Sequence, residues 1–210
     1  TSTFAAGGYR LKPLVRHVMT SRVYQLSATP NETNADDETH FSRGRVQPLE
    51  AEQLLDAVSE VLDRPVKFVG YPAGLRAGEV PAPPQTGSRR GLENMSSRFL
   101  KVFGKPDRLL TCECERSEDG GMLQAFQLLT GELLNELLRH PDNRIGAMLK
   151  AGAADDAVLD ELYLAAVARP PTAAERGKLL GYVRAAADRR AAWEDVAWGL
   201  VNAKEFQLRR

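Results

Sequence analysis

The feature that most constrains this fold is a series of amphipathic segments running from Met122 to Phe206. Within each segment, apolar residues recur three and four positions apart, which is the spacing of one face of an α-helix. Short breaks containing Gly, Pro or Asp separate the segments. Helices joined by short connections pack as antiparallel neighbours. This region therefore predicts a helical bundle with a shared apolar interior.

Local signals mark where several of these helices begin and end. Gly131 is expected to kink or divide a long helix, and Gly152 to end the next one. Pro170 stops the helix before it. Thr172 and Glu175 have the spacing of a capping box, in which the threonine side chain and the glutamate side chain satisfy the first free N–H groups of a helix.

The N-terminal part predicts two further helices. The first begins near Leu11 or Lys12 and extends to residue 26, with one apolar stripe. Residues 27–46 are polar and without period, so we expect a loop. The second covers residues 48–62, with Pro48 as its first helical residue. The stripe of the first helix comprises Leu11, Leu14, Val15, Val18 and Met19.

Strand signals are short and few. Residues 64–94 are rich in proline and glycine and predict a long irregular loop, interrupted by a strand-like run at 66–70. Residues 109–115 alternate between apolar and polar, the period of a strand. Residues 96–104 predict a short helix that closes on Gly104.

The predicted fold class is therefore mainly α, a helical bundle with minor short strands and long irregular loops. We expect one mainly helical domain over residues 1–210. Its parts are an N-terminal helical segment (1–63), a loop-rich segment (64–94) and a C-terminal helical bundle (95–210). The first residues include no initiator methionine, so we also expect the chain to be a fragment of a longer protein.

Charge and hydropathy argue against two classes of partner. The chain has 28 basic and 28 acidic residues, and no basic stripe is interleaved with aromatic residues. Nucleic acid is therefore not an expected partner. No apolar run approaches the roughly 20 residues needed to cross a bilayer, so no membrane span is expected.

The two cysteines, Cys112 and Cys114, lie one residue apart in the hexapeptide TCECER. In a strand both thiols would face the same side, too far apart for an unstrained disulfide. Three interpretations remain open: two small buried thiols, a disulfide in a turn, or a metal or redox site. Structural zinc needs about four ligands, and the three histidines of the chain form no tight pair.

Glu113 and Glu115 would lie on the opposite face of the same strand. Paired carboxylates can act as acid and base or bind a cation. Alternatively, they are solvated or paired with nearby arginines such as Arg108 and Arg116.

Arginines elsewhere suggest two weaker candidate sites. Arg43, with Arg45, precedes a helix that carries Glu52 and Asp56 four residues apart. This spacing indicates either a surface face with ion pairs or an arginine–carboxylate cluster that organises the long loop. Arg76 lies between glycines, where it can bind an anion or simply belong to a surface turn.

Seven stretches together resemble one known family. They include LKPLVRHVMTSRVYQLS, FLKVFGKPDRLLTCECERSED, ELYLAAVARPPTAAE and WEDVAWGLVNAKEF. The chain resembles the C-terminal domain of unknown function in planctomycete cytochrome C-type multidomain proteins. The resemblance implies an exported parent protein, an extracytoplasmic location, no cofactor in this chain, and any haem on another domain of the parent.

Two classes of function follow from these observations. The first is a non-catalytic accessory and interaction domain, whose partners are other domains of the parent protein. The second is an enzyme domain that acts on a carbohydrate-like or oxidisable substrate. It would use Cys112, Glu113, Cys114 and Glu115 together with Arg43, Arg45 or Arg76. The absence of a recognisable catalytic motif favours the first class.

Overall fold

The computed structural model describes all residues except 1, 38, 69, 82–91, 106–121 and 210. Over the described residues the fold is mainly α, as the helical periodicity predicts. The helices in chain order are α1 (Ser2–Ala6), α2 (Leu11–Met19), α3 (Ala51–Leu62), α4 (Leu92–Val102), α5 (Met122–Thr130), α6 (Glu132–Arg139), α7 (Arg144–Lys150), α8 (Asp155–Val167), α9 (Ala173–Ala185), α10 (Arg189–Asn202) and α11 (Lys204–Gln207). The other elements are a 3-10 turn, η1 (Ala77–Glu79), and two short strands, β1 (Gln47–Pro48) and β2 (Leu208–Arg209).

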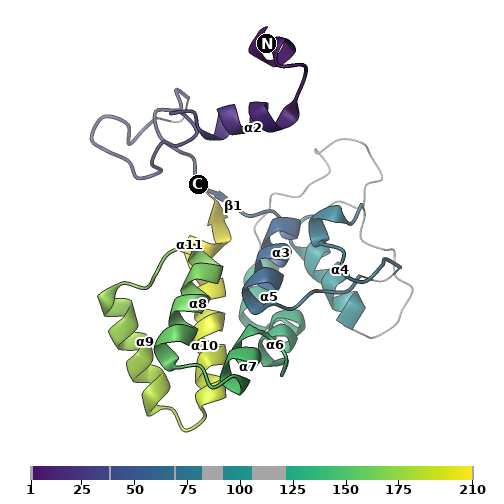
Figure 1. Ribbon diagram of the computed structural model, residues 1–210, viewed down its shortest axis with the longest axis vertical. Coiled ribbons are helices and arrows are strands. Elements are labelled where there is room, and N and C mark those ends of the chain that lie inside the picture. The colour runs from purple at the N-terminus through teal and green to yellow at the C-terminus, as the bar shows by residue number, and fades with distance from the viewer. Residues whose placement is uncertain (1, 38, 69, 82–91, 106–121, 210) are drawn as a thin grey trace. The chain divides into compact units, whose positions relative to one another are not determined.

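The chain divides into two compact units. The smaller unit comprises residues 1–48 and 208–210, and the larger comprises residues 49–207. Figure 1 labels their elements. The expectation of a single domain over residues 1–210 stays a prediction.

Helix α2 of the smaller unit begins at Leu11, as predicted, but ends at Met19 rather than near residue 26. The hydroxyls of Thr20 and Ser21 donate hydrogen bonds of 2.9 and 2.7 Å to carbonyl oxygens of the last helical turn. Serine and threonine side chains compete in this way with the N–H groups that would continue a helix. Polar residues therefore end the helix although the apolar spacing continues.

The small sheet corrects the predicted start of the next helix. Strands β1 and β2 pair antiparallel, with Pro48 opposite Leu208. The prediction that Pro48 is the first residue of a helix over 48–62 is wrong. Helix α3 begins instead after Glu50, whose backbone N–H donates to the side chain of Gln53 at 3.3 Å. This contact caps the helix and fixes its first turn.

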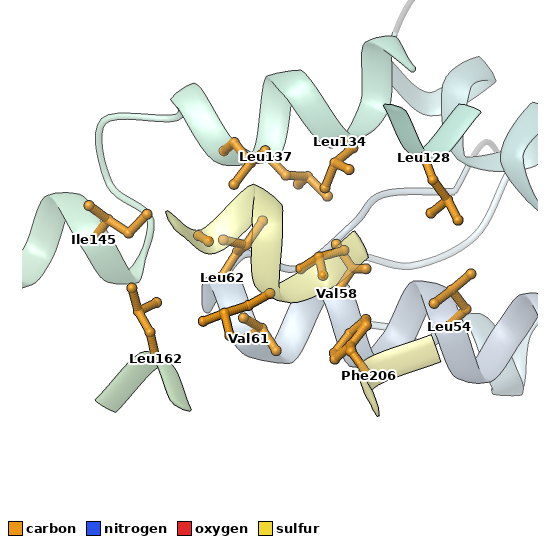
Figure 2. Packing of buried hydrophobic residues seen from close by; sticks show 14 of the residues in the cluster. Leu54, Val58, Val61, Leu62, Leu128, Leu134, Leu137, Ile145, Leu162 and Phe206 are labelled. Carbon is orange, nitrogen blue, oxygen red and sulfur yellow. The ribbon is translucent and has the colours of Figure 1, made fainter. Parts of the chain in front are cut away.

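Helix α3 lies at the centre of the core of the larger unit. It packs against α4, α6, α7, α8 and η1, and Figure 2 shows its apolar side chains facing those of its neighbours. The labelled core residues are Leu54, Val58, Val61, Leu62, Leu128, Leu134, Leu137, Ile145, Leu162 and Phe206. This packing confirms the shared apolar interior that the periodicity predicts.

The C-terminal end of α3 is closed by Arg144 from the start of α7. Its guanidinium donates to the carbonyl oxygens of Glu60 and Val61, each at 2.8 Å. The same side chain forms an ion pair with Glu161 of α8. Carbonyls at a helix C-terminus have no partner within the helix, and a cation there also interacts favourably with the helix dipole.

Several predicted helix ends are confirmed. Gly131 divides α5 from α6, and a Cβ at this position would lie 2.1 Å from the carbonyl oxygen of Gln127. Gly104 follows α4 with φ of +87°, a backbone conformation that favours glycine. The capping box of α9 is present, because Thr172 and Glu175 exchange backbone-to-side-chain hydrogen bonds.

The predicted strand at 66–70 is wrong, since none of its described residues is in a strand. Val66 and Phe68 are buried in the core as the alternation suggests. The hydroxyl of Ser96 donates to the carbonyl oxygen of Lys67 at 2.9 Å, so a side chain from α4 makes a hydrogen bond that a strand partner would otherwise make. The second predicted strand, at 109–115, lies outside the described residues.

Helices α8, α9 and α10 pack against one another in the larger unit (Figure 1). Trp193 of α10 is fully buried, whereas Trp198 is only partly buried. Trp193 therefore belongs to the apolar core, and Trp198 packs against it from a partly exposed position. Across the described helices, none is both long and apolar enough to cross a membrane.

Candidate functional site

Arg43 organises the loop of the smaller unit. Its guanidinium donates to the carbonyl oxygens of Asn34 and Ala35 at 3.2 and 3.4 Å. The carboxylate of Asp37 accepts a hydrogen bond from the Ser42 hydroxyl and from the backbone N–H of His40, and these contacts hold the pKa of Asp37 well below its usual range. The loop therefore contains its own anchors, which the sequence interpretation missed.

Asp56 binds the 3-10 turn η1. Its two carboxylate oxygens accept hydrogen bonds from the backbone N–H groups of Ala77 and Gly78, at 2.7 and 3.1 Å. The first N–H groups of a helical turn lack partners within the turn, so a carboxylate there is favourable. Asp56 thus fixes the segment that contains Arg76.

Lys105 binds carbonyl oxygens of the same segment, whereas Asp56 binds its N–H groups. Its ammonium donates to the carbonyl oxygens of Ala77 and Val80, at 3.0 and 2.6 Å, and lies 3.6 Å from the carboxylate of Glu52. The residue is only 4% exposed. Buried ammonium groups require such partners. The two acids that the sequence analysis noted on α3, Glu52 and Asp56, therefore hold η1 and Lys105.

Arg76 lies at the edge of two grooves on the surface of α3, with volumes of about 250 and 500 Å³. Asp56 and Glu60 line both grooves together with it. The structure thus brings Arg76 close to carboxylates of its own unit. The suggested anion site at Arg76 stays a prediction, and the nearby carboxylates weigh against it.

The four residues of the CECE segment, Cys112, Glu113, Cys114 and Glu115, lie outside the described residues, and their suggested roles stay predictions. Among the residues that are described, no three or more His, Cys, Asp or Glu side chains are grouped to hold a metal ion. His140, one of the histidines considered as a metal donor, has its Nε2 atom 2.8 Å from the Arg64 guanidinium.

A pocket that the sequence analysis did not anticipate lies between α8, α9, α10 and α11. We call it the α8–α10 pocket. It has a volume of about 460 Å³, and most of its surface is apolar. The aromatic side chains of Tyr163, Tyr182 and Trp198 line it, together with three carboxylates and one guanidinium. Ligand pockets in proteins commonly have this size and an apolar lining with a few polar groups.

An ion network around Arg169 lines part of this pocket. The guanidinium forms paired hydrogen bonds with the carboxylates of Glu175 and Glu205, at 2.8–2.9 Å, and also donates to the carbonyl oxygen of Pro170 at 3.2 Å. It lies over the ring of Tyr163, 5.4 Å from the ring centre. Hydrogen bonds from Arg169 and Thr172 lower the pKa of Glu175 to about 2.

A tyrosine–aspartate pair also lines the pocket. The hydroxyl of Tyr182 donates to Oδ2 of Asp195 at 2.5 Å, and this hydrogen bond raises the pKa of Tyr182. Burial raises the pKa of Tyr163 as well. Both phenols are therefore neutral at physiological pH, and Glu175 is ionised.

The sequence contained a partial signal for this pocket. The capping box identified Glu175 as a helix cap, but gave no indication that the same carboxylate binds Arg169. Glu205 lies 36 residues after Arg169, and a contact at that separation has no periodic signature. The aromatic residues were indistinguishable from core positions.

Residues 1–183 match the model of PSD1, a family described as a protein of unknown function (DUF1553). The chain belongs to the PSD1 family. The PSD1 match includes α2, η1, Lys105 and the first part of the α8–α10 pocket, with Arg169, Glu175 and Tyr182. Asp195 and Trp198 follow the matched residues. No curated protein and no solved structure matches the chain.

Proposed function

We propose that this PSD1-family chain is a non-catalytic accessory domain of a larger exported protein and packs against domains upstream of it. The proposal rests on the family resemblance and on one structural observation, the exposed apolar face of α2. Any haem belongs to another domain of the parent, and the setting is extracytoplasmic. These features come from the resemblance to planctomycete cytochrome C-type proteins.

The apolar face of α2 carries the proposal. All five residues of the predicted stripe are exposed, with exposed fractions that include 67% for Leu11, 53% for Val15 and 50% for Met19. Scattered apolar residues on a protein surface are ordinary. A helix that is apolar along one face and charged on the other normally buries that apolar face. An apolar stripe of this kind marks a contact surface for another domain.

Charge around the stripe indicates the chemistry of the partner. Residues 1–31 contain four basic residues and no acidic residue. These basic residues are Arg10, Lys12, Arg16 and Arg22. Complementary potentials steer association and fix the orientation of the two surfaces. We therefore expect the partner domain to present an apolar groove with an acidic rim.

Hydrogen exchange in the complete parent protein tests this proposal. We expect the backbone amides of residues 14–19 to be strongly protected in the parent and to exchange rapidly in the 210-residue chain. Replacing Val15 and Val18 by Asp should abolish the additional protection in the parent while leaving the melting temperature of the 210-residue chain unchanged. A charged group on the apolar face removes the favourable burial.

Leu164 of α8 supplies the matched control. It is 53% exposed, like Val15, but belongs to the other unit. Leu164→Asp should leave the protection of α2 unaltered. Equal exchange of the α2 amides in the parent and in the isolated chain would disprove docking through α2. A fall in the melting temperature of the V15D/V18D chain would show instead that the stripe packs within the chain itself.

A further inference from the structure

We propose that the α8–α10 pocket binds an uncharged aromatic alcohol, such as a phenol or a naphthol. This inference goes beyond the proposed docking through α2 and does not depend on it. It rests on three features of the pocket. Its charged groups are paired or exposed to solvent, its side-chain hydrogen-bond donors are occupied, and its aromatic rings are held by hydrogen bonds.

The charges of the pocket select neither an anion nor a cation. A guanidinium has five N–H groups, and all five in Arg169 are occupied by two carboxylates and the carbonyl oxygen of Pro170. An anionic ligand would have to displace one of these partners. The two carboxylates, those of Glu175 and Glu205, are held by this guanidinium, and the third, Asp195, is exposed to solvent. The pocket therefore favours an uncharged ligand.

The other polar side chains set the hydrogen-bond character of the pocket. The hydroxyl of Tyr182 donates to Oδ2 of Asp195, and the indole N–H of Trp198 donates to the carbonyl oxygen of Leu129 at 3.3 Å. The hydroxyl of Tyr163 hydrogen-bonds to a glutamate of the ion network. Within the part of the chain that the structure describes, Oδ1 of Asp195 accepts no hydrogen bond. A ligand hydroxyl can therefore donate to the pocket, whereas a ligand that only accepts finds no free side-chain donor.

The surface of the pocket suits an aromatic ring. The polar atoms of Tyr182 and Trp198 are bound within the chain, so their rings present carbon surface in a restricted orientation. Contacts between aromatic rings are favourable beyond the burial of apolar area, and restricted side chains lose little entropy on binding. Leu179 and Val196 add aliphatic surface. A sugar would leave several hydroxyls without partners among these side chains, whereas an aromatic alcohol combines an apolar ring with one donor.

Four matched probes test the proposal in the 210-residue chain at pH 7. 2-Naphthol has a ring and a donor, and 2-methoxynaphthalene keeps the ring and the oxygen but has no donor. 2-Naphthoate is an anion, and cellobiose has hydroxyls but no aromatic ring. NMR shifts of the indole N–H of Trp198 and of the amide of Gly199 follow each titration.

We expect 2-naphthol to bind about threefold more tightly than 2-methoxynaphthalene, because one hydrogen bond to a solvent-exposed carboxylate contributes little. Its advantage over 2-naphthoate should be about tenfold or more, since the carboxylate of that probe loses hydration without gaining a donor. Cellobiose should not bind.

Asp195→Asn exchanges the free acceptor of the pocket for a donor. The amide oxygen can still accept from Tyr182, while the amide NH₂ group replaces the second carboxylate oxygen. The preference for 2-naphthol over 2-methoxynaphthalene should therefore disappear in this variant. A preference that persists would overturn the proposed hydrogen bond between the ligand hydroxyl and Asp195.

Gly199 offers a position at which the pocket can be blocked. It lines the pocket, and a Cβ there would meet no other atom of the chain within 4 Å. Gly199→Leu should abolish 2-naphthol binding, whereas Gly181→Leu, at another helix glycine with open space around its Cβ, should not. Equal binding of 2-naphthol to wild type and Gly199→Leu would overturn the proposal. So would the absence of 2-naphthol binding, or tighter binding of 2-naphthoate or cellobiose.

Discussion

The carboxylate of Glu52 lies 3.6 Å from the ammonium of Lys105, and their side chains are only 13% and 2% exposed. One helical turn further along α3, Asp56 binds the N–H groups of η1, while Lys105 binds carbonyl oxygens of the same turn. Asp56 of helix α3 thus holds η1 through its N–H groups, and Lys105 holds it through carbonyl oxygens. This arrangement stabilises a segment that has little regular structure of its own.

Lys105→Met should lower the free energy of unfolding by about 3 kcal/mol, because it leaves two carbonyl oxygens and the carboxylate of Glu52 without this cation in a buried site. Urea denaturation measures the change. Lys150→Met is the control, since Lys150 pairs with Asp142 on the surface and both side chains are 64% exposed. Its effect should stay below about 0.5 kcal/mol. Similar losses in the two variants would contradict the role of Lys105.

Ala168→Gly should stabilise the protein by about 1 kcal/mol. Ala168 follows α8 with φ of +55°, a left-handed conformation that is unfavourable for alanine and accessible to glycine. Ala151 provides the comparison, because it is also an exposed helix C-cap but has φ of −75°. Ala151→Gly should not stabilise and should slightly destabilise, because glycine loses more conformational entropy on folding. Thermal melts of the two variants should therefore shift in opposite directions.

Gly146→Ala should destabilise the larger unit by roughly 3 kcal/mol. A Cβ at Gly146 would lie 2.0 Å from the carbonyl oxygen of Pro141 and 2.6 Å from the guanidinium of Arg190. Gly177→Ala in α9 meets no atom within 4 Å and should stabilise by about 0.5–1 kcal/mol, which is the difference in helix propensity. Chemical denaturation of both variants checks the opposite signs. Stabilisation by Gly146→Ala would show that α7 has room for a side chain.

Acid should weaken the larger unit through Glu175. Hydrogen bonds to Arg169 and Thr172 hold the pKa of Glu175 at about 2 in the folded state, below its ordinary value of 4.5. Between these two pH values the unfolded chain binds more protons, so stability falls as pH decreases. Glu175→Gln should be less stable than wild type at pH 7, and this difference should shrink from pH 5 to pH 2. Urea unfolding of both proteins at several pH values measures the difference between their free energies of unfolding. If that difference does not depend on pH, the ion network does not contribute as proposed.

Structural features could be predicted from the sequence where the residues that determine them lie close together along the chain. The capping box of Thr172 and Glu175 and the division at Gly131 involve residues three or four positions apart, and both were predicted. The prediction of a strand at residues 66–70 was wrong. The alternation of Val66 and Phe68 reflects the burial of these two side chains, whereas a strand also requires a second strand with which to form hydrogen bonds. The predicted end of α2 was wrong because the apolar spacing continues beyond Met19, whereas the hydroxyls of Thr20 and Ser21 bind carbonyl oxygens in the last turn of the helix.

The amino-acid sequence by itself determined the helical class, most helix ends and the apolar face of each helix, because these properties depend on residues within one or two turns. Only the tertiary structure decided that Lys105 binds carbonyls 25 and 28 residues away, and that Arg169 joins Glu175 to Glu205. Such contacts depend on which helices pack side by side. Side chains distant along the chain meet only after apolar burial has fixed that packing.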